Sequence, residues 1–356
     1  MEQDLTQELQ SRIKEASETR RPMMIRGGGT KSFLNPVSRD DLIPLNVSGH
    51  SGIIHYDPHE LVLTARSGTT LENIEEALDQ NGQMLSFEPP HFGTGATLGG
   101  TIACNLSGPR RLYAGAARDM VLGVRMINGR GEILRFGGEV MKNVAGYDVS
   151  RLMAGAMGTL GVLLDVSLKV LPKTAASATV VHRSQADHAL LDMNEKAGTP
   201  LPVSASCYHE GNLYYRLEGA ESAVNSSIKK LGGDLLPGAD DFWQGIREQH
   251  HAFFNSDGTL WRLSVNPSAP ATALDGRWLY EWSGAQRWFM DGDDDHARIR
   301  DLAVTAGGHA TQFKRPDNSI SIFHPPAPEL MEIHVRLKEA FDPGRILNPG
   351  RLFPGL

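Results

Sequence analysis

The stretch GTGATLGGTIACNLSG, residues 93–108, decides how this chain is interpreted. It opens a segment from Gly93 to Gly161 that holds 15 of the chain's 38 glycines. Because glycine has no Cβ, such a segment brings backbone N–H groups close to a ligand and permits positive φ. Loops of this kind hold phosphate groups and lie against flat ring systems. Paired glycines between hydroxyl residues, followed by Asn105 and Ser107, suit a segment along the ribityl chain and diphosphate of a flavin. An irregular surface loop is the alternative.

A second glycine-rich loop, RGGGTK at 26–31, follows the short apolar run 23–25 and predicts a strand-to-loop transition. Its backbone N–H groups and the Thr30 hydroxyl suit a diphosphate, and a plain glycine turn is the alternative. The loop lacks the G-x-x-x-x-G-K-[ST] pattern of a P-loop. Since Phe-Leu-Asn-Pro follows at 33–36, it does not open a crossover helix either. A nicotinamide enzyme with a strand–GxGxxG–helix unit is therefore disfavoured.

Length and composition predict a soluble protein with two domains or one large divided domain. The chain has 356 residues, 40% hydrophobic and 22% charged, and a net charge of −7 that argues against a nucleic-acid surface. No secretory signal and no run of 18 apolar residues is found. Cys104 and Cys207 are too few for an iron–sulfur cluster or a disulfide framework. We therefore expect cytoplasmic placement, and we assign any iron–sulfur chemistry to another subunit.

Apolar spacing predicts the elements of the first 172 residues. A helix is expected at 4–17 with Asp4 as its cap, and another after a capping box of Thr69 and Glu72. Asn-Gly-Arg-Gly at 128–131 predicts a hairpin between two strands. The next strand is expected to end before Pro172, and its single apolar face is predicted to consist of Val162, Leu164, Val166, Leu168 and Val170.

The amino-acid composition changes after about residue 175, where aromatic residues become more frequent and glycines less frequent. Strands grouped with helices, without strict alternation, predict an antiparallel α+β cap domain. The expected strands lie near 178–183, 203–209, 213–218, 259–265 and 278–282. The expected helices lie at 185–197, 220–231 and 293–306, and a last helix is expected at 328–341.

The order of the motifs resembles the vanillyl-alcohol-oxidase/PCMH-type FAD-binding family, and more narrowly the smaller FAD-binding subunits of bacterial glycolate oxidases. The motifs are GGGT at 27–30, TLGGTIACN at 97–105, RDMVLGV at 118–124, KNVAGYD at 142–148, GTLGV at 158–162 and FDPGRILNPGR at 341–351. The similarity covers nearly the whole chain and is most specific in residues 25–172 and 341–353.

The resemblance implies an α+β fold in three parts. A PCMH-type FAD-binding domain of two subdomains is expected at 1–174, and an antiparallel α+β cap at 175–310. A C-terminal helix and tail at 311–356 are expected to pack back on the FAD domain. Several family members attach FAD through a histidine in the first loop. Here that loop has glycines, so non-covalent FAD is expected.

The resemblance also implies the residues that contact FAD, in two loops and two further segments. The first loop supplies Gly27, Gly28, Gly29 and Thr30. The second loop supplies Thr97, Gly99, Gly100, Thr101, Asn105, Ser107 and Gly108. Gly161 and Val162 are expected beside the cofactor, and Asn348 is expected to bring the tail to the flavin side.

Candidate catalytic residues are few. Oxidation of a hydroxy acid needs a base for the hydroxyl proton and a cation for the carboxylate. We consider His309, which follows the last cap helix, and Arg315, and for His309 a structural or partner contact is the alternative. No metal site is expected. His55 and His59 are predicted around a solvated turn, and His250 and His251 at the C-terminal end of a helix. The acidic run at 291–295 predicts a helix cap without calcium-loop spacing.

These observations favour an FAD subunit of a heteromeric complex that oxidises glycolate to glyoxylate. A sister flavoprotein is expected to perform most of the chemistry, and an iron–sulfur subunit to pass electrons to an acceptor such as quinone. The complex is expected in the cytoplasm or at the inner face of the cell membrane. The alternatives are a self-sufficient FAD-dependent 2-hydroxy-acid dehydrogenase and a non-redox scaffold subunit.

Overall fold

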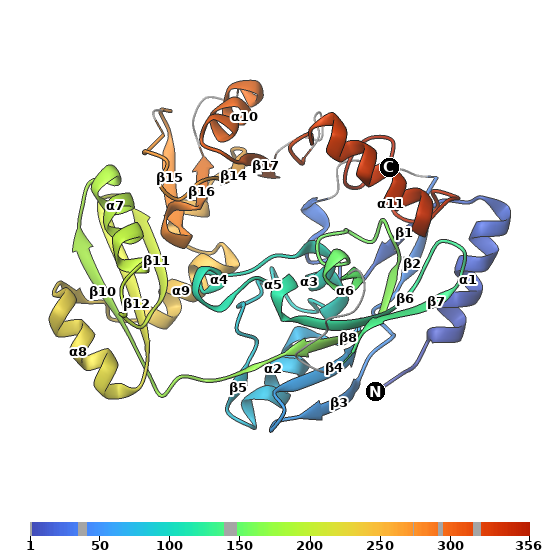
Figure 1. Ribbon diagram of the computed structural model, residues 1–356, viewed down its shortest axis with the longest axis horizontal. Coiled ribbons are helices and arrows are strands. Elements are labelled where there is room, and N and C mark those ends of the chain that lie inside the picture. The colour runs from blue at the N-terminus through green and yellow to red at the C-terminus, as the bar shows by residue number, and fades with distance from the viewer. Residues whose placement is uncertain (1, 35–40, 139–147, 273, 291–294, 316–321) are drawn as a thin grey trace. The chain divides into compact units, whose positions relative to one another are not determined.

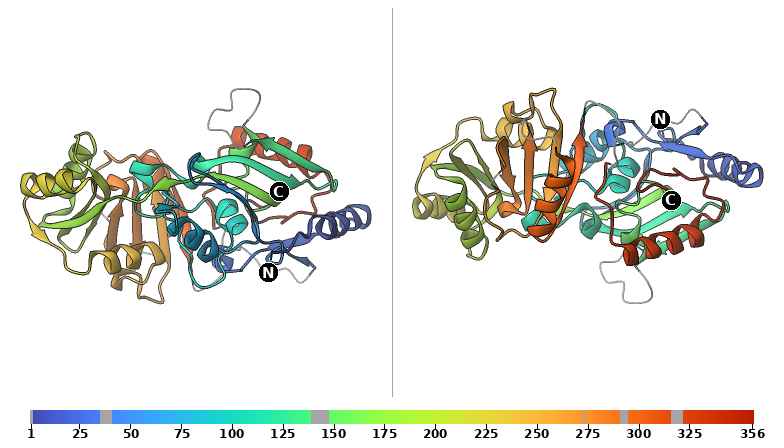
Figure 2. Two further views of the ribbon diagram at one scale, coloured as in Figure 1. Left: turned by 90° about the horizontal axis from the view of Figure 1, so that it is seen from below. Right: turned by 90° about the horizontal axis from the view of Figure 1, so that it is seen from above.

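The computed structural model describes residues 2–34, 41–138, 148–272, 274–290, 295–315 and 322–356. Its elements form two compact units (Figures 1 and 2). Unit 1 comprises Met1–Leu106, Ala116–Pro172 and Pro325–Leu356, and unit 2 comprises Ser107–Gly115 and Lys173–His324. The mixture of helices and antiparallel sheets confirms the predicted α+β class. The three-part division after residues 174 and 310 stays a prediction, and residues 142–147 of the KNVAGYD motif lie outside the described residues.

Unit 1 is built on a five-stranded antiparallel sheet of order β3-β4-β8-β6-β7. Its strands are β3 (Ile53–Asp57), β4 (Val62–Arg66), β6 (Val121–Ile127), β7 (Ile133–Gly137) and β8 (Val162–Lys169). The predicted hairpin is present, since β6 and β7 pair across residues 128–131. A short antiparallel pair, β5 (Gln83–Met84) and β9 (Leu171–Pro172), lies outside this sheet.

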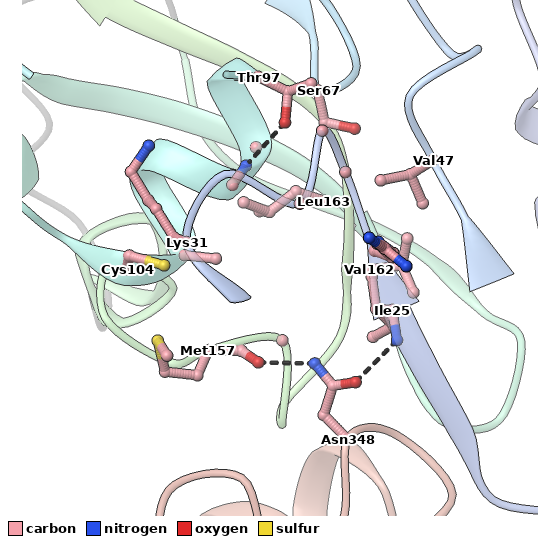
Figure 3. A pocket seen from close by; sticks show the side chains of 18 of the residues that line it. Ile25, Lys31, Val47, Ser67, Thr97, Cys104, Met157, Val162, Leu163 and Asn348 are labelled. Atoms are coloured by element: carbon pink, nitrogen blue, oxygen red, sulfur yellow. Dashed lines mark hydrogen bonds between the residues drawn. The ribbon is translucent and has the colours of Figure 1, made fainter. Parts of the chain in front are cut away.

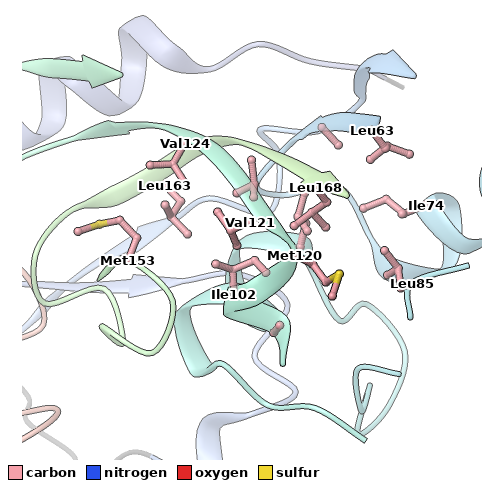
Figure 4. Packing of buried hydrophobic residues seen from close by; sticks show 14 of the residues in the cluster. Leu63, Ile74, Leu85, Ile102, Met120, Val121, Val124, Met153, Leu163 and Leu168 are labelled. Atoms are coloured by element: carbon pink, nitrogen blue, oxygen red, sulfur yellow. The ribbon is translucent and has the colours of Figure 1, made fainter. Parts of the chain in front are cut away.

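Helices supply the main core of unit 1 together with this sheet (Figure 4). They are α2 (Leu71–Asp79), α3 (Leu98–Cys104), α5 (Ala117–Met120) and α6 (Val149–Leu152). Ile74 of α2 and Ile102 of α3 are fully buried in one cluster with Leu63 and Leu168 of the sheet. Burial of such a side chain stabilises the fold by about 1.5–3 kcal/mol. This packing fixes the position of α3, which carries part of the predicted second FAD loop.

A second core in unit 1 joins the two ends of the chain. It contains residues of α1 (Thr6–Thr19), β1 (Met23–Arg26) and β2 (Ile43–Asn46). Strands β1 and β2 run parallel, and Leu347 makes a parallel bridge to Met23. The tail that contains Leu347 follows α11 (Pro328–Phe341), the helix predicted at 328–341.

The apolar residues of β8 differ from the prediction of a single face. Val162 and Leu164 pack in the core with α1 and β1, whereas Val166, Leu168 and the neighbouring Leu163 pack in the main core. The pairing of β8 with β6 shifts register between Arg125 and Met126, so side chains on either side of the shift point to different cores.

The cap of α2 also differs from the prediction. Thr70, not Thr69, is the N-cap, and its hydroxyl accepts the N–H of Asn73. The Thr69 hydroxyl is buried and accepts the N–H of Gly52 at 2.9 Å. Two adjacent threonines were both suitable caps, and the contact with Gly52 decides between them.

Unit 2 is built on an eight-stranded antiparallel sheet of order β13-β10-β12-β11-β15-β16-β14-β17. Its strands are β10 (Ala176–Arg183), β11 (Val203–His209), β12 (Asn212–Gly219), β13 (Asp234–Leu235), β14 (Leu260–Ser264), β15 (Arg277–Glu281), β16 (Gln286–Met290) and β17 (His309–Lys314). Its longer helices are α7 (Ala186–Ala197), α8 (Glu221–Leu231), α9 (Ala239–Glu248) and α10 (His296–Thr305). The sequence did not predict α9, β13, β16 or β17.

The segment Ser107–Gly115 belongs to unit 2, although it continues the predicted FAD loop. The Gly108 carbonyl accepts the indole N–H of Trp282 at 3.0 Å, and Arg110 pairs with Glu218 at 2.9 Å. A short helix, α4 (Arg111–Ala114), contacts β11. The loop predicted as one FAD-binding segment therefore divides between the two units after Leu106.

Candidate functional site

A cavity in unit 1 brings together most of the residues predicted to contact FAD (Figure 3). Its empty volume is about 1060 Å³, with the open solvent at its mouth included. It lies between the β1 loop, α3, the loop before β8 and the C-terminal tail. The predicted residues that line it are Gly27, Gly28, Gly29, Thr30, Thr97, Gly99, Gly100, Gly161, Val162 and Asn348.

Glycine is required where the two predicted FAD loops meet. A Cβ on Gly27 would overlap the Thr97 hydroxyl, and a Cβ on Gly28 would overlap the Gly95 carbonyl oxygen. A Cβ on Gly99 would lie 2.7 Å from the Ser67 Cβ. These distances are too short for van der Waals contact, so the backbones approach this closely only because side chains are absent.

Four predicted residues do not line the cavity. Thr101 is fully buried, and its hydroxyl has no hydrogen-bond partner within the described ranges. Asn105 ends α3 in the left-handed conformation with φ 51°, and its Oδ1 accepts the Arg118 N–H at 3.1 Å. Ser107 and Gly108 belong to unit 2.

Asn348 lines the cavity and cross-links its walls (Figure 3). Its Oδ1 accepts the N–H of Ile25 in β1 at 2.7 Å, and its Nδ2 donates to the Met157 carbonyl at 2.7 Å. The side-chain amide therefore fixes the tail, β1 and the loop before β8 relative to one another. Both of its polar atoms bind backbone groups, so Asn348 shapes the cavity wall.

The charges at the cavity are positive. Its lining includes Arg26, Lys31 and Arg351, and none of the described lining residues is Asp or Glu. Lys31 is buried and donates to the His91 carbonyl at 3.4 Å. A lining that carries cations and, among its described residues, no carboxylate favours binding of an anion. The sequence analysis did not select Lys31 or Arg351 as ligand-binding residues, although the motifs RGGGTK and FDPGRILNPGR end at them.

The polar atoms of the lining suit a dinucleotide such as FAD. The Ser67 hydroxyl and the Nε of Arg351 are buried without a hydrogen-bond partner among the described residues. A buried polar group without a partner costs about 1–3 kcal/mol, and a ligand with phosphate and hydroxyl groups removes that cost. Glycine-lined walls, unpaired polar atoms and positive charge together suit the charge and the hydrogen-bonding groups of FAD.

Cys104, at the end of α3, is half-buried and lines the same cavity, whereas Cys207 is fully buried in unit 2. Burial raises the pKa of the Cys104 thiol, and the charges of Arg351 and Lys31 partly oppose this. Burial raises the pKa of Cys207 well above its usual range. Cys104 is therefore the thiol that reports on occupancy of the cavity.

We expect FAD to slow alkylation of Cys104. With apoprotein at pH 9, iodoacetamide is expected to label Cys104, and saturating FAD is expected to reduce the labelling rate by about tenfold because the ligand covers the thiol. Peptide mass spectrometry measures the label at each cysteine, and Cys104→Ser is the control. Equal labelling rates with and without FAD would place the cofactor elsewhere.

The two candidate catalytic residues lie in or after β17 of unit 2, and the structure does not bring them together. His309 begins the strand and Arg315 follows its end, which separates them by about 20 Å of extended chain. The neighbouring strand brings Arg262 to the sheet face of His309, because Arg262 pairs with Thr311 and Ser264 with His309. The sequence analysis missed Arg262.

The pKa values of His309 and Arg262 are both lower than those of free side chains. Desolvation and the charge of Arg262 lower the pKa of His309, so its ring is neutral at pH 7. Desolvation and Arg111 lower the pKa of Arg262 to about 10, and its guanidinium stays charged. A neutral, exposed imidazole and a half-buried guanidinium on one face suit a base and a carboxylate ligand.

The described residues contain no group of three or more His, Cys, Asp or Glu side chains that can hold a metal ion. Within the same residues, no helix has the length and apolarity needed to cross a membrane. The part of the acidic run at 291–294 lies outside them, and Asp295 caps α10 by accepting the N–H groups of Ala297 and Arg298.

Comparisons with known proteins support the FAD assignment. A protein-family model described as "FAD binding domain" matches residues 4–137. The chain is 46% identical to glycolate oxidase subunit GlcE of Escherichia coli (strain K12), across 99% of both chains. It is 31% identical to glycolate oxidase subunit GlcD of Bacillus subtilis (strain 168), across 98% of this chain and 87% of that one.

More distant proteins are also similar to this chain over most of its length. The mitochondrial D-2-hydroxyglutarate dehydrogenase of Arabidopsis thaliana is 30% identical, across 98% of this chain and 74% of its own. A solved alkyldihydroxyacetonephosphate synthase aligns with a TM-score of 0.67 over 96% of this chain and 74% of its own, at 15% identity, and so shows the fold alone. The PCMH-type fold, the FAD cofactor and the oxidoreductase class expected from the sequence are confirmed. The chain belongs to the family of FAD-binding oxidoreductase subunits that includes GlcE and GlcD.

Proposed function

We propose that this chain is the FAD-binding subunit of a multi-subunit enzyme that oxidises glycolate to glyoxylate. The observation that carries the proposal is the 46% identity to GlcE over 99% of both chains. The similarity to GlcD, another glycolate oxidase subunit, supports the same function. The glycine-lined, positively charged cavity of unit 1 supplies the place for the cofactor.

In this proposal the residues around the cavity bind and orient FAD, which supplies the two-electron acceptor for substrate oxidation. The backbone of Gly27–Thr30 and the Thr97–Gly100 turn hold the diphosphate. The Ser67 hydroxyl supplies a further hydrogen bond. Asn348 keeps β1 and the loop before β8 at a fixed separation through its two backbone hydrogen bonds. FAD remains non-covalent and dissociable.

Partner subunits complete the reaction in the proposed enzyme. The described residues that line the cavity include no His, Asp or Glu that could accept the hydroxyl proton of the substrate. A sister flavoprotein therefore oxidises glycolate. Because two cysteines cannot ligate an iron–sulfur cluster, an iron–sulfur partner conducts electrons toward an acceptor such as quinone. The complex works in the cytoplasm or at the inner face of the cell membrane.

A second candidate is a self-sufficient 2-hydroxy-acid dehydrogenase, favoured by the position of His309 and Arg262 on one face of the sheet. The neutral imidazole of His309 would accept the hydroxyl proton, and Arg262 or Arg315 would bind the substrate carboxylate. Anaerobic reduction of the isolated chain's flavin by glycolate, lost in His309→Gln, would establish this alternative.

Affinity purification from the native host tests the proposal. The tagged chain is expected to be recovered with a second flavoprotein and an iron–sulfur protein. The eluate is expected to reduce dichlorophenolindophenol with glycolate, and the rates with D-lactate and D-2-hydroxyglutarate define the substrate range. The Gly28→Ala variant, which is expected to bind FAD more weakly, is the matched control. Recovery of the chain alone, with no glycolate-dependent reduction, would reject the complex.

A further inference from the structure

We infer that Arg351, in the C-terminal tail, binds an anionic group of the FAD held in unit 1. This inference rests on the proposed placement of FAD in the glycine-lined cavity. The partial burial of Arg351 and the small number of hydrogen bonds to its guanidinium support it.

The guanidinium of Arg351 is far from saturated by the protein. It lines the cavity, and its Nη1 donates to the Ile25 carbonyl at 3.5 Å, the upper limit for a hydrogen bond. Its Nε is buried without a partner among the described residues. A guanidinium has five N–H donors, so most of this group's capacity remains for a ligand.

Arg351 is half-buried, and a fully buried cation of unit 1 shows the contrast. Lys338 is 1% exposed, and its ammonium contacts Asp342 at 2.8 Å, the Thr159 carbonyl at 2.8 Å and the Leu347 carbonyl at 2.7 Å. A cation that serves the fold alone is thus neutralised by a carboxylate and saturated by acceptors. Arg351 has no carboxylate in its surroundings among the described lining residues. Burial without a counter-ion is costly, and a bound anion offsets that cost.

The tail holds Arg351 at the cavity through backbone contacts. The N–H of Arg351 donates to the Asn348 carbonyl at 3.2 Å, and the N–H of Asn348 donates to the Met23 carbonyl at 3.0 Å. Asn348 is further fixed by its own side chain. The guanidinium is therefore presented from a backbone that is already ordered, which reduces the entropy lost on binding.

Two anionic groups of the cofactor suit a guanidinium: the diphosphate, which is charged in every state, and the ring system, which gains negative charge on reduction. Arginine binds oxyanions through paired N–H donors, and a cation near the ring favours the reduced form. Binding of riboflavin distinguishes the two groups, because riboflavin has the ring system without the phosphates.

Arg351→Gln and Arg351→Lys are compared with Arg345→Gln, which removes a charge from an exposed position of the same tail. Fluorescence titration of apoprotein gives Kd for FAD and riboflavin, and redox titration gives the midpoint potential. If Arg351 binds the diphosphate, Arg351→Gln is expected to weaken the binding of FAD by about 10- to 100-fold and to leave the Kd for riboflavin unchanged. If Arg351 instead binds the ring system, Arg351→Gln is expected to weaken the binding of reduced FAD. A tenfold weaker binding of the reduced form lowers the two-electron midpoint potential by about 30 mV.

Either result, with partial recovery in Arg351→Lys and no change in Arg345→Gln, supports the inference. Unchanged FAD affinity and unchanged potential in a folded Arg351→Gln protein would overturn it and would leave the cofactor site standing. If FAD fails to protect Cys104 in the wild-type protein, the proposed site itself is wrong, and the assignment of Arg351 fails with it.

Discussion

Gly28→Ala is expected to remove FAD from the protein. The added Cβ would overlap the Gly95 carbonyl oxygen, a backbone atom that no side-chain rotation can move. The two FAD loops must therefore separate, and overpacking of this kind costs about 1–3 kcal/mol, equivalent to an increase in Kd of up to about 100-fold. Titration of apoprotein with FAD measures the change.

Gly138→Ala is the matched control for this substitution. Gly138 also lies in unit 1, and a Cβ there has no atom of the described residues within 4 Å. We expect its FAD affinity to equal that of the wild-type protein. Circular dichroism of both apoproteins checks that the fold is retained. Wild-type affinity in Gly28→Ala would show that the contact between the two loops is not needed for binding.

Lys338→Met is expected to cause the largest loss of stability, about 3–5 kcal/mol in the free energy of unfolding. The substitution removes the cation and leaves the carboxylate of Asp342, which is fully buried, without its counter-ion. Asp342 also accepts the N–H groups of Ile346 and Leu347, which lead into the part of the tail at the cavity. We therefore expect weaker FAD binding as well.

Arg336→Met provides the comparison on the same helix. Arg336 forms an exposed pair with Glu332 at 3.4 Å, and such pairs contribute about 0–1 kcal/mol. Denaturant unfolding of both apoproteins gives the two free energies. Losses of similar size in the two variants would mean that the buried pair of Lys338 and Asp342 does not secure the tail.

The glycine-rich loops were predictable because their function requires a residue type that the sequence displays directly. Gly27, Gly28 and Gly99 line the cavity because no other residue fits there, and composition alone points to them. Lys338 was not predictable in the same way. A lysine four residues before Asp342 is typical of an exposed helical pair, and only the return of the tail buries it.

Elements buried on both sides were the hardest to predict. All five residues of β16 are buried, so the strand shows no alternation of polar and apolar residues. Helix α9 begins after a left-handed glycine, without a side-chain cap. The role of Arg351 depends on tertiary structure in the same sense, because its unsatisfied Nε becomes visible only when the tail lies against β1.

The visible spectrum of the chain purified alone, before and after anaerobic addition of glycolate, tests the central claim most directly. The account predicts the absorption bands of oxidised flavin, which persist with glycolate and bleach only when dithionite is added. Bleaching by glycolate alone would identify the chain as an independent catalyst. A colourless protein that does not acquire these bands when FAD is added would contradict the account.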